Sequence, residues 1–326
     1  MKSRNAIIAS AVAIVTLAAG CASGSSGSSG SVGAAPRLPL EKTSIVVAAF
    51  PAIDSAGLYI AQDDGLFQKA GLHVTIKPTE NPTADIPALL HGSVDVLSGQ
   101  YTTYIAATAA GVAKMRILAA GYALGPQVQE IMSPPHSRLA TPAQLRGKTI
   151  AVNAVDSVTT DLLYTALAPY RIAPGQVHVV AIPFPVMPAA LAAGRVDAIY
   201  EVEPYVSEAA ERYGDYDLAD IDTGASANFP INGYGALASW AARYPRTARA
   251  FTTAIEQGNR IAATDPAALQ RTLEKQLHLS ANVVDVMATG AFPIDLDPVQ
   301  IQRDADLMLR YGQLSSPFNV KQITGP

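Results

Sequence analysis

Two short patterns recur in this chain, and both recur at the same separation. Ala-Ile-Asp-Ser at positions 52–55 returns as Ala-Val-Asp-Ser at positions 154–157. Leu-Leu-His-Gly-Ser-Val-Asp at 89–95 returns as Leu-Ala-Ala-Gly-Arg-Val-Asp at 191–197, again 102 residues later. Two independent matches at one separation predict that the chain folds as two copies of one structural unit.

Short β-branched runs alternate with helical stretches from residue 43 onward, which is typical of βαβ units on a mainly parallel sheet. The first copy predicts strands at 44–49, 73–77 and 94–97, with helices at 56–69 and 83–91. The second copy predicts strands at 148–152, 177–182 and 196–200, with helices at 159–170 and 187–193. Gly92 and Gly194 each follow a helix, where left-handed geometry is favourable without a Cβ atom.

Asp95 and Asp197 stand at the start of a short buried strand in each copy. We expect their carboxylates to bond nearby backbone rather than a ligand. A helix is expected to continue from residue 205 to 213. The Asp-Pro pairs at 265–266 and 297–298 predict the starts of later helices, which are expected to pack on the first copy.

The composition suits a well-packed α/β body of two ordinary lobes, since 49% of the 326 residues are hydrophobic and 15% are charged. A formal net charge of -4 excludes a strongly basic nucleic-acid-binding protein. Cys21 is the only cysteine, so a disulfide, a cysteine nucleophile and a thiolate metal site are excluded from the body. The five histidines are scattered and no phosphate loop or metal motif occurs, so we expect no metal and no cofactor.

The N-terminus has the features of a secretory signal. Lys2 and Arg4 precede an uncharged run at 6–19, which is shorter than the ~20 residues that span a bilayer core. Residues 17–21, Leu-Ala-Ala-Gly-Cys, resemble a bacterial lipobox, with Ala18 where Leu is usual. We therefore predict a signal peptide at 1–20, a lipidated Cys21 and a flexible Ser/Gly tether over 21–42. The protein would be extracytoplasmic, anchored to the outer face of the cell membrane; the alternative is an ordinary secretory-signal cysteine.

Ligands of open α/β sheets bind outside the carboxyl ends of the strands. Four segments occupy such ends here: 52–57, 98–102, 153–160 and 200–205. The candidate ligand-binding residues in or near them are Asp54, Ser55, Gly57, Gly99, Gln100, Tyr101, Tyr122, Asn153, Asp156, Ser157, Val158, Thr159, Glu201, Glu203 and Tyr205.

The candidates differ in what they offer a ligand. Asp54 and Asp156 precede helices, so each is either an N-cap or a ligand contact. Ser157, Thr159 and Thr160 offer more hydroxyls than one helix start needs, and Gly57 leaves room for close approach. Gln100 and Asn153 would supply orienting hydrogen bonds. The tyrosines at 101, 104, 122, 200 and 205 would either stack on a flat or cationic ligand or serve packing.

Charge separates the ligand classes. The four segments contain acidic residues but no Lys or Arg. A desolvated sulfonate or nitrate would meet these acids without a compensating cation. A neutral or cationic ligand is therefore ranked above an inorganic anion.

Phe50-Pro51 followed by the stretches at 56–67 and 71–74 resembles the opening of the substrate-binding proteins of nitrate, sulfonate, taurine, bicarbonate and thiamine-precursor ABC importers. Residues 89–95, 145–152 and 191–197 resemble later landmarks of the same family, so the resemblance covers about residues 44–255. It implies the type II periplasmic-binding-protein fold, an α/β structure of two lobes with a ligand cleft between them. We expect lobe I over 43–127 and 237–326, and lobe II over 128–236.

The resemblance implies a monomeric solute-binding lipoprotein that closes on a small molecule and delivers it to an ABC permease and its ATPase. With the charge argument it favours a nitrogen-containing solute such as a thiamine-precursor-like pyrimidine, although Trp240 lies outside the strand ends where pyrimidine-binding relatives stack their ligand. The alternatives are an anion-binding protein for nitrate, sulfonate or taurine, and a sensor that passes its ligand to a receptor. A further alternative is an enzyme of the same fold that makes pyrimidine or menaquinone precursors, but we expect no enzyme.

Overall fold

The computed structural model describes residues 38–79 and 85–325. The predicted signal peptide, Cys21 and most of the predicted tether lie outside the described residues. From Leu40 onward the chain forms one compact unit.

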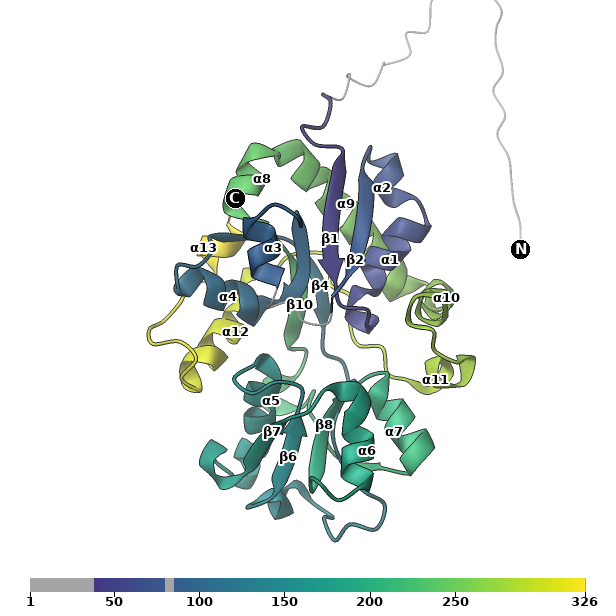
Figure 1. Cartoon of the computed structure of the whole chain (residues 1–326), viewed down its shortest axis with the longest axis vertical. Coiled ribbons are helices and arrows are strands. Elements are labelled where there is room, and N and C mark those ends of the chain that lie inside the picture. Colours follow the sequence, from purple (N-terminus) through teal and green to yellow (C-terminus); the bar gives the residue numbers. More distant parts are fainter. Residues whose placement is uncertain (1–37, 80–84, 326) are drawn as a thin grey trace, which may run out of the picture. The chain divides into compact units, whose positions relative to one another are not determined.

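The first sheet has five strands in the order β2-β1-β3-β10-β4 (Figure 1). These strands are β1 (Ser44–Ala49), β2 (His73–Pro78), β3 (Val96–Gln100), β4 (Met115–Ala123) and β10 (Pro230–Leu237). Strand β1 pairs in parallel with β2 and β3, whereas β10 runs antiparallel between β3 and β4. The predicted parallel part is therefore confirmed, and two strands are added to it.

The second sheet repeats this arrangement in the order β7-β6-β8-β5-β9. Its strands are β5 (Gln129–Ser133), β6 (Thr149–Val152), β7 (His178–Ala181), β8 (Ala198–Val202) and β9 (Tyr216–Asp220). Strand β6 pairs in parallel with β7 and β8, and β5 runs antiparallel between β8 and β9. The two sheets thus share one strand order, which confirms the two copies predicted from the repeat.

Strand β10 lies inside the range predicted for lobe II, yet it pairs with two strands of the first sheet. The chain returns to the first sheet at Pro230, earlier than the predicted boundary at residue 237. The reason is pairing: the free edges of β3 and β4 accept β10 between them.

Helices connect the strands of both sheets. The first part of the chain has α1 (Ala56–Asp63), α2 (Leu66–Lys69), α3 (Ile86–Leu90) and α4 (Tyr101–Ala109). The second has α5 (Val158–Leu167), α6 (Met187–Ala192) and α7 (Tyr205–Tyr213). The C-terminal part has α8 (Ala238–Arg243), α9 (Pro245–Thr264), α10 (Pro266–Leu277), α11 (Ala281–Val286), α12 (Pro298–Arg310) and α13 (Lys321–Thr324). Short 3-10 turns include η1 (Ile53–Ser55), η3 (Pro142–Leu145), η4 (Ala168–Tyr170), η5 (Pro174–Gln176), η6 (Phe184–Val186) and η7 (Gly224–Ser226).

Local signals explain where several helices begin and end. The helix predicted over 56–69 is interrupted because Gly65 adopts a left-handed φ of 67° between α1 and α2. Asp265 caps α10 by accepting from the backbone N–H of Ala268, and Asp297 caps α12 in the same way. The Asp-Pro helix starts are thus confirmed, and α9, α10, α12 and α13 contact elements of the first sheet or its helices, as expected.

Helix α9 lies directly against α1 (Figure 1). The contact depends on two glycines, since a Cβ atom on Gly258 would lie 2.1 Å from the backbone oxygen of Gly57. A Cβ atom on Gly57 would lie 1.9 Å from Asn259 Oδ1. Gly57 therefore serves close helix packing in this structure, rather than close approach of a ligand.

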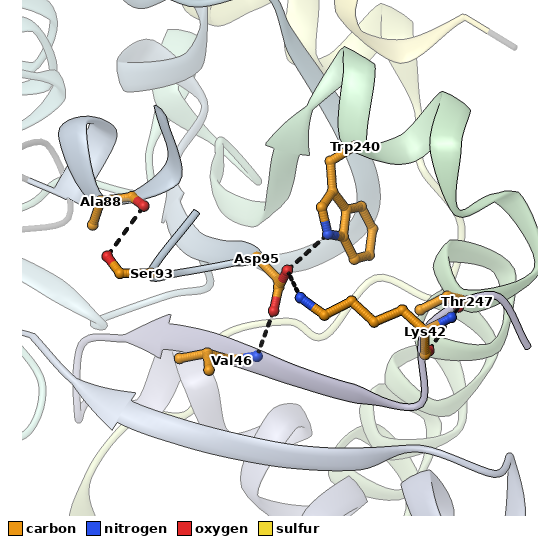
Figure 2. Close-up of polar contacts among 7 residues, drawn as sticks. All are labelled: Lys42, Val46, Ala88, Ser93, Asp95, Trp240 and Thr247. Atoms are coloured by element: carbon orange, nitrogen blue, oxygen red, sulfur yellow. Dashed lines mark hydrogen bonds and ion pairs between the residues drawn. The ribbon is translucent and has the colours of Figure 1, made fainter. Parts of the chain in front are cut away.

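Asp95 ties the start of β3 to its surroundings (Figure 2). Its carboxylate accepts from the backbone N–H of Val46 at 2.9 Å, from Lys42 Nζ at 2.5 Å and from Trp240 Nε1 at 2.8 Å. Asp95 is 5% exposed. The predicted backbone role is confirmed, and the single tryptophan belongs to this structural network.

Asp197 makes the corresponding contacts in the second sheet. Its carboxylate accepts from the backbone N–H of Thr149 at 2.9 Å and from Lys148 Nζ at 3.2 Å. The side chain of Asp197 is 40% exposed, whereas that of Asp95 is 6% exposed. The two copies thus keep one contact pattern at different depths.

Candidate functional site

The carboxyl end of the first sheet brings together polar residues from three parts of the chain. Asp54 lies in η1, directly after β1, and is half-buried. Asn232 Nδ2, on β10, donates to Asp54 Oδ2 at 2.8 Å. Ser55 Oγ lies 3.4 Å from Asp54 Oδ1 and 3.4 Å from Ser98 Oγ on β3. We call Asp54, Ser55, Ser98 and Asn232 the Asp54 cluster.

Asp54 is held by neutral groups. None of the ion pairs found among residues 38–79 and 85–325 involves it. Burial raises the pKa of Asp54 to about 7, although the hydrogen bonds from Ser55 and Asn232 act to lower it. A carboxyl group with this pKa and no cation beside it is suited to receive a positively charged or hydrogen-bond-donating group.

Neither predicted aspartate caps a helix. Ser55 is the N-cap residue of α1 and Ser157 is the N-cap residue of α5, with no side-chain capping bond at either. Asp54 instead bonds Asn232, while Asp156 is exposed and adopts a left-handed φ of 53°. The N-cap interpretation is therefore wrong for both.

Asn232 is a member of the cluster that the sequence interpretation missed. It pairs with Gln100 across β10 and β3, which places it at the same edge as the predicted segment. Its Oδ1 lies against Gly121, where a Cβ atom would approach it to 2.3 Å. Its 2% exposure in an otherwise apolar strand is the unusual feature, since buried amides need hydrogen-bond partners.

The other predicted residues at this end of the first sheet differ in how deeply they are buried. Gly99 pairs with Gly233, and Gln100 is half-buried at the end of β3. Tyr101 is 2% exposed and lies over Gly233, whose added Cβ would be 2.7 Å from its ring hydroxyl. Of these three, Gln100 keeps contact with solvent at the strand end.

The tyrosines serve packing in this structure. Tyr104 OH donates to the backbone oxygens of Leu97 and Gly233, and Tyr200 OH donates to Gln129 Oε1. Tyr122 OH donates to the backbone oxygen of Thr289 at 3.0 Å, and its ring meets Phe292 edge-on at 5.4 Å. Their rings, like that of Tyr101, are fully buried, so the packing alternative holds for these four.

At the second predicted helix start, two hydroxyl groups bond the chain's own backbone. Ser157 Oγ donates to the backbone oxygen of Ala154 at 2.7 Å, and Thr160 Oγ1 donates to the same oxygen at 2.9 Å. Val158 is a core residue and Thr159 is 5% exposed. Asn153 is half-buried, and its Oδ1 accepts no hydrogen bond within the described residues.

Glu201 and Glu203 are both buried at the end of β8. Burial raises the pKa of each above its usual range. Glu203 is tied down, since it accepts from Ser207 Oγ at 2.8 Å and from the backbone N–H of Ala288 at 3.1 Å. Tyr205 is half-buried and stacks on Phe184 with ring centroids 6.2 Å apart.

Tyr122 lies near both Asp54 of the first lobe and Glu203 of the second lobe. Burial raises its pKa well above the usual value, and the charges of Asp54 and Glu203 raise it further. Both acids therefore lie within electrostatic reach of one buried ring. The structure brings Asp54 and Ser55 together and links Asp54 through Asn232 to the strand pair that carries Gln100.

Two cavities lie near the C-terminal helices. One of about 640 Å³ is lined mainly by apolar residues of α9, α10 and α11 and by the segment 287–293. The other, of about 460 Å³, lies between α7 and α11 and includes Glu203, Glu211 and Asp217 in its wall. Glu203 is the one predicted site residue in either wall.

The described residues hold no group of three or more His, Cys, Asp or Glu side chains that could bind a metal ion. Over the ranges 38–79 and 85–325, no helix has the length and apolar character needed to cross a bilayer.

Two five-stranded sheets of one order, each with an antiparallel fourth strand, define a two-lobed protein of the periplasmic-binding-protein type. Solved structures share this fold. The aliphatic sulphonate-binding protein SsuA of Escherichia coli is 20% identical, with a TM-score of 0.72 over 87% of this chain and 92% of that one. The nitrate-binding protein NrtA of Synechocystis PCC 6803 is 17% identical, with a TM-score of 0.74 over 87% and 85%. The desulfurization enzyme DSZB is 16% identical, with a TM-score of 0.65 over 87% and 97%.

The sequence itself places the chain in a family. Residues 52–269, more than half of the chain, match the family described as NMT1/THI5 like, and the chain belongs to that family. The resemblance inferred from the sequence patterns is thereby confirmed. No curated protein matches the sequence.

Proposed function

We propose that this protein is the solute-binding component of an ABC importer. Membership of the NMT1/THI5-like family and a fold shared with sulphonate- and nitrate-binding proteins support this function. The protein would act as an extracytoplasmic monomer, anchored through a lipid on Cys21. It would close its two lobes on a small solute and deliver that solute to a permease and its ATPase.

We further propose that the solute is a small nitrogen-containing molecule, with an aminopyrimidine-like thiamine precursor favoured. The observation that carries this is Asp54, a half-buried carboxyl group bonded by Asn232 and Ser55 and by no cation in the described structure. A protonated amine or ring nitrogen would supply the missing opposite charge. A sulfonate or nitrate at the same place would be repelled by ionised Asp54.

The rest of the proposed site follows from the strand ends. Gln100, half-buried at the end of β3, would contact the solute directly, whereas Ser55 is fully buried and would hold Asp54 in place. Asn153, Ser157 and Thr159 would contact it from the second lobe. Gly57, Tyr101, Tyr122 and Val158 would act indirectly, because they pack the helices and strands that carry these groups.

Isothermal titration calorimetry with a panel of aminopyrimidines, small amines, taurine and nitrate would test the proposal. We expect binding of an aminopyrimidine or amine, and a loss of at least about tenfold in affinity for Asp54→Asn, which is about 1.4 kcal/mol. The matched control is Asp156→Asn, the exposed copy of the same motif. Binding of taurine or nitrate alone, or equal effects of the two variants, would contradict it.

A further inference from the structure

Helix α12 contacts both lobes. It packs beside α4 of the first lobe and also touches α5 of the second (Figure 1). The guanidinium of Arg303 on α12 donates to the backbone oxygens of Ala225 and Ala227, both at 3.0 Å, and to that of Asn228 at 3.3 Å. One arginine thus holds the loop around η7, which leads from the second sheet back to β10.

The end of α12 makes a second set of contacts with α5. Gln313 Nε2 donates to Asp161 Oδ1 at 2.7 Å. The hydroxyl of Tyr311 lies 3.2 Å from Thr165 Oγ1, and its ring lies 5.4 Å from the ring of Tyr164. We call α12 together with Tyr311 and Gln313 the strap.

Two carboxyl groups are buried where the strap meets α5. Asp161 on α5 is 1% exposed and Asp304 on α12 is 0% exposed. Asp161 Oδ2 and both oxygens of Asp304 accept no hydrogen bond from any residue in the described parts of the chain. Such groups are tolerated when they carry a proton, because an ionised carboxylate needs partners or water.

The surroundings favour the protonated forms. Burial raises the pKa of Asp161 to about 7, with a further rise from Asp156 and an opposing effect of the Gln313 hydrogen bond. Burial raises the pKa of Asp304 well above its usual value; Arg303 acts to lower it and Asp161 to raise it.

The other titratable groups around these two carboxyls are tyrosines, and Asp222 acts on Arg303 from the loop before η7. Tyr164 on α5 packs on Tyr311 at the end of the strap, and Tyr101 on α4 lies within electrostatic reach of Asp304. Arg303 is therefore the one cation among these named neighbours, and it is already committed to backbone oxygens.

We propose that the strap is a proton-dependent fastening between the two lobes, which holds α5 while Asp161 and Asp304 are protonated and releases it when they ionise. Separation of α5 from α12 would return both carboxylates to water, where they ionise near pH 4. The fastened form therefore binds more protons than the released form. Fastening is strongest at acidic pH and is lost as the pH rises to 7 and above.

Small-angle X-ray scattering of the purified protein without any solute would test the inference. Between about pH 5 and about pH 9, the radius of gyration of the wild type should increase. The double variant Asp161→Asn/Asp304→Asn should keep one radius across this range. Asp306→Asn, on the exposed side of the same helix, should expand like the wild type.

A wild-type radius that is the same at both pH values, or a double variant that still expands, would overturn the proposal. Hydrogen exchange of the wild type provides a test that needs no variant. After correction for intrinsic rates, the amides of α5 and α12 should lose protection above pH 7 while those of β1 keep theirs; equal protection throughout would also overturn it. Since no solute is used, the result is independent of the proposed importer function.

Discussion

Replacing Asp54 by Asn would test whether this carboxylate binds the solute. It would also test how far its burial lowers the stability of the native protein. The amide has nearly the shape of the carboxylate and can still accept the hydrogen bond from Asn232 Nδ2, but the negative charge is lost. We expect the variant to lose solute binding and to melt at a higher temperature than the wild type above pH 7.

The size of this gain follows from the pKa of Asp54. Burial raises it from 3.8 to about 7, so between these values the native protein keeps a proton that the unfolded chain has released. Stability is therefore lost as the pH rises through this window and stays low above it. The full difference corresponds to roughly 4 kcal/mol. Because the side chain keeps some contact with water, we expect a smaller effect. The free energy of unfolding of Asp54→Asn should exceed that of the wild type by roughly 2 kcal/mol above pH 7.

Thermal unfolding between about pH 4 and about pH 9 measures this difference, which corresponds to a rise of about 4–8 °C at neutral pH and above. Asp64→Asn, an exposed carboxylate directly after α1, is the matched control and should show no gain that grows with pH. A difference between Asp54→Asn and the wild type that does not grow from pH 4 to pH 7 would refute the reasoning.

Three further substitutions test separate features of the molecule. Gly258→Ala should destabilise the protein by about 1–3 kcal/mol, because its Cβ would meet backbone of α1, whereas Gly175→Ala, with open space around it, should not; equal melting temperatures would contradict this. Asp95→Ala should cost about 3 kcal/mol in urea unfolding and the exposed Asp197→Ala about 1 kcal/mol or less, and a reversed order would contradict the burial argument. Cys21→Ser should move the protein from the membrane fraction to the soluble one, and continued sedimentation with membranes would exclude the lipid anchor.

The parallel part of each sheet could be predicted because its signals are local. Strand β1 was predicted with its observed ends, and the repeat supplied the second copy. Strand β10 was not predicted, since Pro-Ile-Asn-Gly-Tyr-Gly-Ala-Leu has the proline and glycines that disfavour strands. Those glycines are required by distant residues: a Cβ on Gly235 would lie 2.7 Å from the ring of Tyr104. Non-local packing, which the local sequence does not reveal, decides this strand.

In the candidate site, too, residues set by local sequence order could be predicted and residues set by distant contacts could not. The strand-end rule located Asp54 and Ser55, because it depends on the order of strands and helices alone. It missed Asn232, which reaches Asp54 from 178 positions further along the chain. It also counted Tyr101 and Tyr122 as ligand contacts, since position at a strand end does not determine whether a ring points outward or into the core.

The repeated Asp-Ser motif has diverged in its backbone as well as its neighbours. Asp54 sits in a 3-10 turn, half-buried and bonded to β10, so its charge is held in a partly desolvated place. Asp156 has a left-handed backbone, and its side chain is exposed because Ser157 and Thr160 bond the loop through the oxygen of Ala154 instead. A charge in water discriminates weakly between ligands, whereas a partly buried one discriminates strongly. In the proposed site, selection by charge would therefore belong to the first lobe, and the second lobe would contribute hydroxyl and amide groups.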